Sequence, residues 1–212
     1  MLYPGEDLLG SFRDSANIQL AKVIMLMMTT SDNTASLWLQ LLAGTGTRIN
    51  ELLDSLGFIS TRVNSRTAGR QENWKLYGWG QTTPREMVAI MERLYHRRLL
   101  GKSQDELMLR LMGRNYWNEE ALSQIPPEIF VASKNGAVDA SRSETMLVMA
   151  PNGPYIVSVI TKNQKDTSWN SGNEGWVLSR KLSRLLWNHF EPRSTWKPVL
   201  DLKGNPEEKR ND

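Results

Sequence analysis

Two short polar groups of residues contain the side chains of this sequence that could do chemistry. The first is Ser31-Asp32-Asn33 and the second is Lys134-Asn135-Gly136. A polar turn between apolar segments is costly to bury, so we expect the first group to have a task. A strand lysine can stabilise negative charge that develops nearby, and a glycine lets a ligand approach the backbone closely. Acyl transfer at an amide needs such groups beside a nucleophile and a base.

Apolar residues recur at helical spacing on both sides of the first group, which predicts helices over 18–28 and 34–43. In the second of these helices, Leu37, Leu41 and Leu42 share one side, with Trp38 beside them. The same reasoning predicts further helices over 49–56, 83–100, 103–111 and 172–190, with a short turn over 119–124. Strands are predicted over 129–134, 145–150 and 155–161.

A Ser-Asp-Asn turn between helices, followed at long range by a Lys-x-Gly strand, resembles the class A β-lactamase and penicillin-binding-protein superfamily. The resemblance covers roughly residues 8–190. It implies an α/β (α+β) fold of the β-lactamase/transpeptidase type, in which a helical lobe lies beside an antiparallel sheet. It also implies one partial domain over residues 1–200. The charged residues 201–212 are then predicted to be a disordered tail.

The resemblance gives each residue of the first group a role. Ser31 is expected to be catalytic and to relay a proton toward the leaving nitrogen, between the nucleophile and Lys134. Asn33 is expected to present its side-chain amide to the acyl amide of the substrate. Asp32 is expected to hold the turn by accepting backbone N–H groups. Serine is also common where helices are joined, so a capping role is the alternative for Ser31.

The resemblance also assigns the second group and the residues after it. Lys134 is expected to be catalytic and to attract the substrate carboxylate. Asn135 replaces the usual threonine or serine and can still donate to that carboxylate, while Gly136 lets the ligand lie close to the strand. The backbone N–H of Ala137 is expected to be one oxyanion donor. Arg142 could supply a second cation, and the alternative for it is an ordinary surface arginine.

The nucleophile motif of the superfamily, Ser-x-x-Lys at a helix start, does not occur before Ser31. Ser194 and Lys197 have that spacing, but they lie between Pro192 and Pro198, and we interpret them as a chance match. We therefore expect a fragment, truncated at its N-terminus, that lacks the nucleophile segment, the first helix and the outer strands of the sheet. Such a chain is expected to be inactive alone.

Residues 60–81 show no periodicity, which predicts a long loop of the Ω type. Its aromatic residues Trp74, Tyr77 and Trp79 are expected to pack and to fix the loop.

In class A enzymes this loop carries a glutamate that activates the deacylating water. Counting from the flanking motifs puts that position near Thr67, where no glutamate stands. Glu72 is the only acid between Asp54 and Glu86. We expect it to be a salt-bridge partner, of Arg66 or Arg70, rather than a base.

Composition excludes several other classes of function. The 212 residues carry 26 basic and 23 acidic side chains, a net charge of only +3, and the two signs are interspersed, which argues against nucleic-acid binding. There is no cysteine, and the two histidines have no ligand spacing, so no metal or other cofactor is expected. No apolar run reaches the length of a membrane span. The resemblance implies a monomer in the periplasm or secreted.

The predicted function is that of a serine β-lactamase-like hydrolase that opens the β-lactam amide through an acyl-enzyme. One alternative is a penicillin-binding protein that resembles D-Ala-D-Ala peptidases. Another is a non-catalytic module that binds β-lactams or wall peptides. The missing loop glutamate and Asn135 favour the alternatives, whereas the loop exit Thr82-Thr83-Pro84 favours the first prediction. The partner in each case is a small-molecule β-lactam or a peptidoglycan stem peptide.

Overall fold

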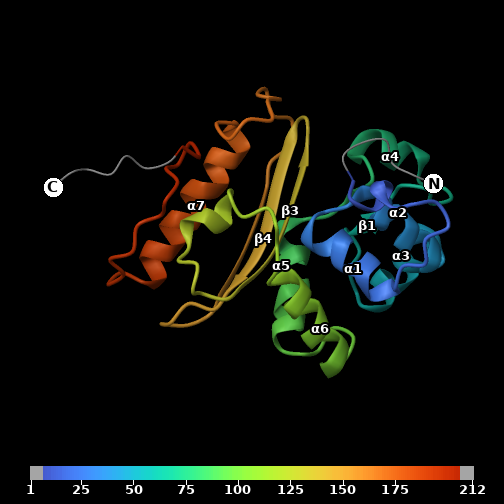
Figure 1. The fold of residues 1–212 in the computed structure, drawn as a ribbon, viewed down its shortest axis with the longest axis horizontal. Coiled ribbons are helices and arrows are strands. Elements are labelled where there is room, and N and C mark those ends of the chain that lie inside the picture. Colours follow the sequence, from blue (N-terminus) through green and yellow to red (C-terminus); the bar gives the residue numbers. More distant parts are fainter. Residues whose placement is uncertain (1–6, 206–212) are drawn as a thin grey trace. The chain divides into compact units, whose positions relative to one another are not determined.

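The computed structural model of the protein describes residues 7–205. The chain divides into two compact units, Met1–Ile90 and Met91–Asp212, and the boundary falls inside helix α5 (Pro84–Tyr95). The first unit is mainly helical, and the second combines helices with an antiparallel sheet (Figure 1). This is the α+β composition that the sequence predicts. Within residues 7–205, no helix has the length and hydropathy of a membrane span.

The first unit consists of helices and one short β-ribbon. Its elements are η1 (Leu9–Ser11), α1 (Leu20–Thr29), α2 (Asn33–Leu42), α3 (Thr45–Ser55), β1 (Arg62–Val63), α4 (Gln71–Tyr77), β2 (Gly80–Gln81) and the start of α5. A small core forms where Leu9, Val23, Leu26 and Ala35 meet, so η1 and the first two helices pack together. Helices α1, α2 and α3 agree with the predicted ones to within a few residues, whereas α4 lies inside the stretch 60–81 that was predicted to be a loop.

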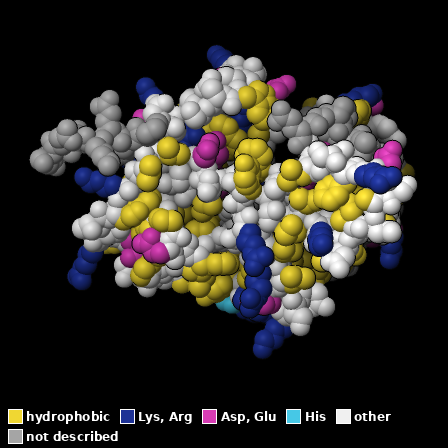
Figure 2. Space-filling model, viewed as in Figure 1, with side chains coloured by type: hydrophobic (Ala, Val, Ile, Leu, Met, Phe, Trp, Pro, Cys, Tyr) yellow, Lys and Arg dark blue, Asp and Glu magenta, His cyan; other side chains and the backbone are white. Residues whose placement is uncertain are grey.

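Helix α2 differs from its prediction in which side chains it buries. Leu37 is buried, but Trp38, Leu41 and Leu42 keep 40%, 57% and 61% of their surface exposed. Hydrophobic side chains interrupt the polar surface elsewhere as well (Figure 2). Helical periodicity identified a shared apolar side, but burial depends on whether another element packs against it.

The second unit is a three-stranded sheet with helices. Its elements after α5 are α6 (Lys102–Met112), η2 (Ala121–Gln124), β3 (Val131–Val138), β4 (Ser141–Val148), β5 (Tyr155–Ile160) and α7 (Glu174–Phe190). The strands are antiparallel in the order β3-β4-β5. Helix α7 and η2 cover one face of the sheet (Figure 1), where Val131, Met146, Val148 and Trp187 are buried in one cluster.

Two strands are longer or displaced relative to their predictions. β3 continues through Asn135 and Gly136, which are typical turn residues, as far as Val138. β4 begins at Ser141, whereas the predicted strand begins at residue 145. The prediction missed the first residues because Arg142 and Glu144 are charged but occupy inward positions, where the alternating pattern requires apolar residues. Lys134 therefore lies inside a paired strand and not at its end.

The segment after α7 is fastened to the second unit by buried polar groups. The Arg180 side chain is fully buried and forms an ion pair with Glu120 at 2.7 Å. The Arg180 guanidinium also donates to the backbone oxygens of Glu119, Ser171 and Leu202. Residues 201–205, the start of the predicted tail, form a hydrogen-bonded turn. That residues 201–212 are disordered stays a prediction. The rest of that tail, 206–212, lies outside the described residues.

Candidate active site

The Ser-Asp-Asn turn is held by Asp32, as predicted. Asp32 is buried and is the N-cap of α2, since one carboxylate oxygen accepts from the Ala35 N–H at 2.7 Å. The other oxygen accepts from the Leu9 N–H at 2.8 Å and so anchors η1. Ser31 has a φ of +61°, a left-handed conformation that is uncommon for a residue with a side chain, and it is exposed.

A second carboxylate at the start of α2, that of Asp7, was not predicted from the sequence. Asp7 accepts from the Asn33 N–H at 3.1 Å and from the Thr34 N–H at 2.7 Å. It also accepts from the Asn33 side-chain nitrogen at 3.2 Å and from the Thr34 hydroxyl at 2.9 Å. Two aspartates thus neutralise the positive end of one helix. The Asn33 amide, expected to meet a substrate, is oriented by Asp7.

Lys134 lies in the middle of β3, a strand at the edge of the sheet. Among residues 7–205, β3 has a strand neighbour on one side only, β4. The Lys134 amine is half-buried and donates to the Asn135 backbone oxygen at 2.6 Å. Burial lowers the pKa of Lys134 to about 8, against the attraction of the Glu144 carboxyl. The ammonium form therefore still predominates at pH 7 and is lost above about pH 8, earlier than for an ordinary lysine.

The residues next to Lys134 on β3 are Asn135, Gly136 and Ala137, the other candidates for ligand contacts. A Cβ at Gly136 would lie 3.0 Å from the Ser143 hydroxyl oxygen of the neighbouring strand, so a larger residue fits poorly there. The backbone of an edge strand offers unpaired N–H and C=O groups to a ligand. This position suits the roles proposed for Gly136 and Ala137.

Glu144 is a buried carboxyl that the sequence analysis did not identify. It is the direct β4 partner of Asn135, and one of its oxygens accepts from the Ala121 N–H at 3.0 Å. Burial raises the pKa of Glu144 to about 8. An acidic residue at an inward position of an alternating strand was the signal that could have revealed it.

Arg142 requires a correction, because it is fully buried and is not a surface residue. Its guanidinium lies 4.6 Å from the centre of the Trp169 ring and 5.5 Å from that of Trp176. It donates to several backbone oxygens, including that of Ser168 at 2.6 Å. Alternation along the paired strands puts Arg142 and Lys134 on opposite faces of the sheet. We therefore leave Arg142 out of the proposed ligand contacts.

The long loop is fixed mainly by polar contacts, and its aromatic residues are more exposed than predicted. Trp74, Tyr77 and Trp79 keep 49%, 53% and 36% of their surface exposed. The Trp79 backbone oxygen accepts from the N–H groups of both Asn64 and Ser65, which closes the loop beside the β1·β2 ribbon.

The start of the loop is tied to α5 by Glu86. Its carboxylate accepts from the backbone N–H groups of Ile59, Ser60 and Thr61 and from the Thr61 hydroxyl. Burial opposes ionisation, but these hydrogen bonds prevail and lower the pKa of Glu86.

Neither the position of Thr67 nor Glu72 suits a base that activates the deacylating water. Thr67 is buried, and its hydroxyl lies so close to α3 that a Cβ added at Gly46 would be 1.8 Å away. A glutamate in place of Thr67 would therefore lack room in this packing. Glu72 is 84% exposed and forms a salt bridge with Lys75 at 2.7 Å. The predicted ion-pair role is confirmed, but the partner is Lys75 and not Arg66 or Arg70.

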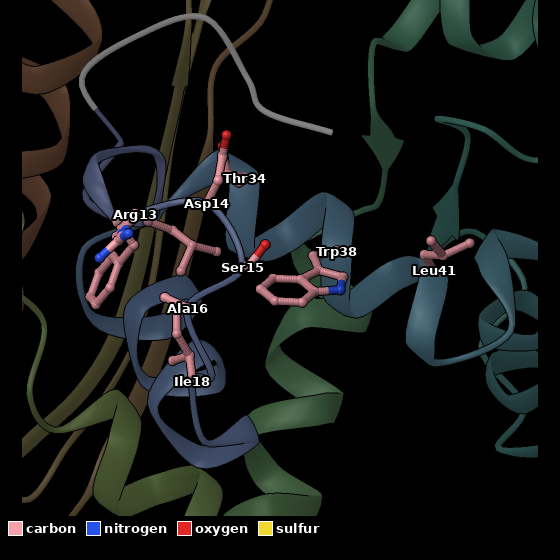
Figure 3. A pocket seen from close by; sticks show the side chains of 10 residues that line it. Arg13, Asp14, Ser15, Ala16, Ile18, Thr34, Trp38 and Leu41 are labelled. Carbon is pink, nitrogen blue, oxygen red and sulfur yellow. The ribbon is translucent and has the colours of Figure 1, made fainter.

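The Ser194–Lys197 match is not at a helix start, since the residues between α7 and Asn205 form no helix. A pocket of about 350 Å³ lies in the first unit, between residues 9–18 and the Thr34, Trp38 and Leu41 side of α2 (Figure 3). None of the predicted site residues lines this pocket.

The predicted site residues fall in both compact units. Ser31 and Asn33 belong to the first unit, and Lys134, Asn135, Gly136 and Ala137 belong to the second. That the two groups converge on one ligand stays a prediction.

An α+β fold with a Ser-Asp-Asn turn and a Lys-x-Gly edge strand defines the class of the β-lactamases and penicillin-binding proteins. The sequence matches the model of the Beta-lactamase enzyme family over residues 1–190, and the chain belongs to that family. A search of curated proteins finds no match.

Solved structures of the same class share the fold. PBP-A matches with a TM-score of 0.76 and 22% identity over 90% of this chain and 68% of its own. A leucine-to-glutamate variant of PBP-A, an acyl-enzyme complex with penicillin G, matches with the same TM-score and identity over 90% and 69%. A β-lactamase from Sphaerobacter thermophilus matches with a TM-score of 0.77 and 21% identity over 90% and 70%.

Proposed function

We propose that this chain carries the proton-relay and carboxylate-binding groups of a serine β-lactamase-like site that opens the β-lactam amide through an acyl-enzyme. The observation that carries the proposal is the position of Lys134-Asn135-Gly136 on β3, an edge strand with a half-buried lysine. A cation beside unpaired backbone groups can bind a carboxylate and an amide of the same ligand.

The roles follow from the side chains and their surroundings. Lys134 binds the ligand carboxylate. The Asn135 side chain alternates with that of Lys134 and lies on the sheet face of Arg142, so we leave it out of this contact as well. Ser31 passes a proton between Lys134 and the leaving nitrogen. The Asn33 amide, oriented by Asp7, contacts the acyl amide, and the Ala137 N–H donates to the developing oxyanion.

This chain should bind penicillin G without becoming acylated, because no Ser-x-x-Lys stands at a helix start in residues 7–205. Incubation with penicillin G followed by intact-mass spectrometry of the denatured chain should show the unmodified mass. Equilibrium dialysis of the native chain with labelled penicillin G should show saturable binding. A penicilloyl adduct on any serine, or the absence of saturable binding, would refute the proposal.

A second candidate, a penicillin-binding protein that acylates but deacylates slowly, is favoured by the loop. Its only acid, Glu72, points into solvent with Lys75 as its partner, and Thr67 is packed against Gly46. Hydrolysis of an acyl-enzyme needs a base within hydrogen-bond reach of a water. A serine site completed by this loop would therefore trap the acyl group.

We also infer a monomeric protein of the periplasm or secreted, since β-lactams and wall peptides are encountered outside the cytoplasm. Cell fractionation and size-exclusion chromatography would test these two points.

A further inference from the structure

Basic side chains are concentrated in one stretch of the second unit, residues 93–114, which covers the end of α5, the connection to α6 and α6 itself. We call this stretch the α5–α6 segment. It carries six basic and two acidic side chains, a net charge of +4, whereas the whole chain has a net charge of +3. The rest of the protein is therefore left with a net charge of −1. The basic residues of the segment are Arg93, Arg97, Arg98, Lys102, Arg110 and Arg114.

Both acids of the α5–α6 segment are engaged inside it. Asp105 is fully buried, and its carboxylate accepts from two backbone N–H groups of the connection, at 2.8 and 2.9 Å. Glu106 forms ion pairs with Arg97 at 2.6 Å and with Arg110 at 3.1 Å. Neither acid is therefore left to neutralise the remaining cations of the segment.

Three of those cations, Arg98, Lys102 and Arg114, are exposed. Their side chains have no hydrogen-bond or ion-pair partner among residues 7–205. The connection that carries Arg98 is held in one conformation by Arg97, whose φ is +58° and whose guanidinium donates to two backbone oxygens at the end of α5, at 3.2 and 2.7 Å. The segment thus presents uncommitted positive charge on a fixed backbone.

Helix α6 exposes apolar side chains beside these cations. Leu107 keeps 56% of its surface exposed, and Leu100 in the connection keeps 43%. Leu111 lies on the same side of α6 as Leu107, four residues further on, and is half-buried. Arg110, three residues after Leu107, also lies on this side, and its side chain is 71% exposed. The buried residues of α6 face the other way, so its outer side combines leucine with arginine.

We propose that the α5–α6 segment is a membrane-binding surface that attaches the protein to bilayers of anionic lipids. Lipid phosphates receive Arg98, Lys102 and Arg114, while Leu100 and Leu107 enter the boundary between headgroups and acyl chains. The exposed leucines favour a bilayer over a nucleic acid, because phosphates alone would bind the cations and leave the leucines in water. The inference is independent of the proposed β-lactam chemistry, which uses none of these residues.

The first test is co-sedimentation of the full chain with large unilamellar vesicles at low ionic strength. The native chain should bind to vesicles of phosphatidylcholine mixed with phosphatidylglycerol and should not bind to vesicles of phosphatidylcholine alone. A basic residue near an anionic surface strengthens binding by roughly fivefold, so Arg98→Gln and Lys102→Gln should each weaken it by about that factor. Equal binding to both kinds of vesicle, or binding to neither, would overturn the proposal.

The control for charge is Lys181→Gln, which removes the same charge from an exposed position on α7, a helix well separated from α6 in Figure 1. Its binding should equal that of the native chain, because solvent and salt screen a charge that lies away from the bilayer. If Lys181→Gln lost as much binding as Arg98→Gln, net charge rather than the α5–α6 segment would drive the attachment, and the proposal would fail.

The second test addresses the leucines. Leu107→Gln keeps a good helix former on the outer side of α6 and removes the apolar side chain. It should weaken vesicle binding roughly 3- to 30-fold, because part of the burial of a leucine is lost. Leu185→Gln, at a leucine of α7 with 63% of its surface exposed, is the matched control and should bind like the native chain. Unchanged binding of Leu107→Gln would mean that no leucine enters the bilayer, and would overturn the proposal.

A soluble polyanion is the rival partner, and a competition experiment distinguishes it from a bilayer. Duplex DNA at the same phosphate concentration as the vesicles should displace the native chain only in part, because it offers no apolar phase to the leucines. Complete displacement by DNA, together with unchanged vesicle binding of Leu107→Gln, would assign the surface to a polyanion and refute attachment to a membrane.

Discussion

Replacement of Lys134 by methionine is expected to weaken the binding of penicillin G roughly 10- to 150-fold. A hydrogen bond to a charged partner contributes about 1.5–3 kcal/mol, and methionine keeps the apolar stem while it removes the charge. Isothermal titration calorimetry at pH 7 would measure the loss. Lys181→Met is the control, because Lys181 is exposed on α7, a helix that covers the sheet face opposite to Lys134. Equal losses in both variants would mean that only net charge matters.

The same interaction should depend on pH in a defined direction. Burial lowers the pKa of Lys134 to about 8, so its ammonium form is present below this pH and is lost above it. The ligand carboxylate stays ionised throughout. Affinity should therefore be constant from about pH 6 to 7.5 and should then fall by about tenfold per pH unit above pH 8. Constant affinity up to pH 10 would show that Lys134 does not bind the carboxylate.

Replacement of Arg180 by methionine is expected to destabilise the protein by about 3–5 kcal/mol, the usual cost of removing one partner of a buried ion pair. Arg180 is fully buried, and its loss would strand Glu120 and three backbone oxygens. Burial raises the pKa of Glu120 to about 7, so protonation should relieve part of the cost in more acidic solution. Urea unfolding at pH 5.5 and pH 8 would measure both effects.

The control for Arg180 is Arg193→Met, which removes the same charge from an exposed position after α7. Its unfolding midpoint should match that of the native protein. If Arg180→Met also kept the native midpoint, the buried network would contribute no net stability, and the account of how residues 201–205 are held would be wrong.

Local patterns in the sequence were sufficient for the features that depend on neighbouring residues. Periodicity located the helices around Ser31, and the turn chemistry of Asp32 identified the cap of α2, because a cap is decided within four residues. The position of Lys134 on a strand was also predictable. The family resemblance then connected these residues to one chemistry.

The features that escaped prediction depend on contacts between distant segments. Asp7 reaches Asn33 across 26 residues, and nothing in its own neighbourhood indicates this contact. Arg142 and Glu144 are buried, although charged residues usually remain exposed. The Arg142 guanidinium packs against indole rings and donates to backbone oxygens, and the Glu144 carboxyl accepts from a backbone N–H. Because both residues are charged, the first half of β4 lacks the alternation of apolar and polar residues that predicts a strand.

The aromatic residues of the loop illustrate the opposite error. Trp74 and Tyr77 suggested packing, yet Arg70 links Asn64 to Gln81 by hydrogen bonds and helps to fix the loop instead. Polar networks of this kind require the partners to be known, and composition alone does not supply them.

If the Ser31 turn and the Lys134 strand act on one ligand, the effects of Ser31→Ala and Lys134→Met on affinity should not be additive, and a double-mutant cycle measures this. The affinity for penicillin G would be measured for the native chain, Ser31→Ala, Lys134→Met and the double variant, with the exposed Ser55→Ala in place of Ser31→Ala as the control cycle. We expect a coupling of about 0.5–3 kcal/mol between Ser31 and Lys134 and none between Ser55 and Lys134. Strict additivity of Ser31→Ala and Lys134→Met, with no loss of affinity in Ser31→Ala, would contradict it.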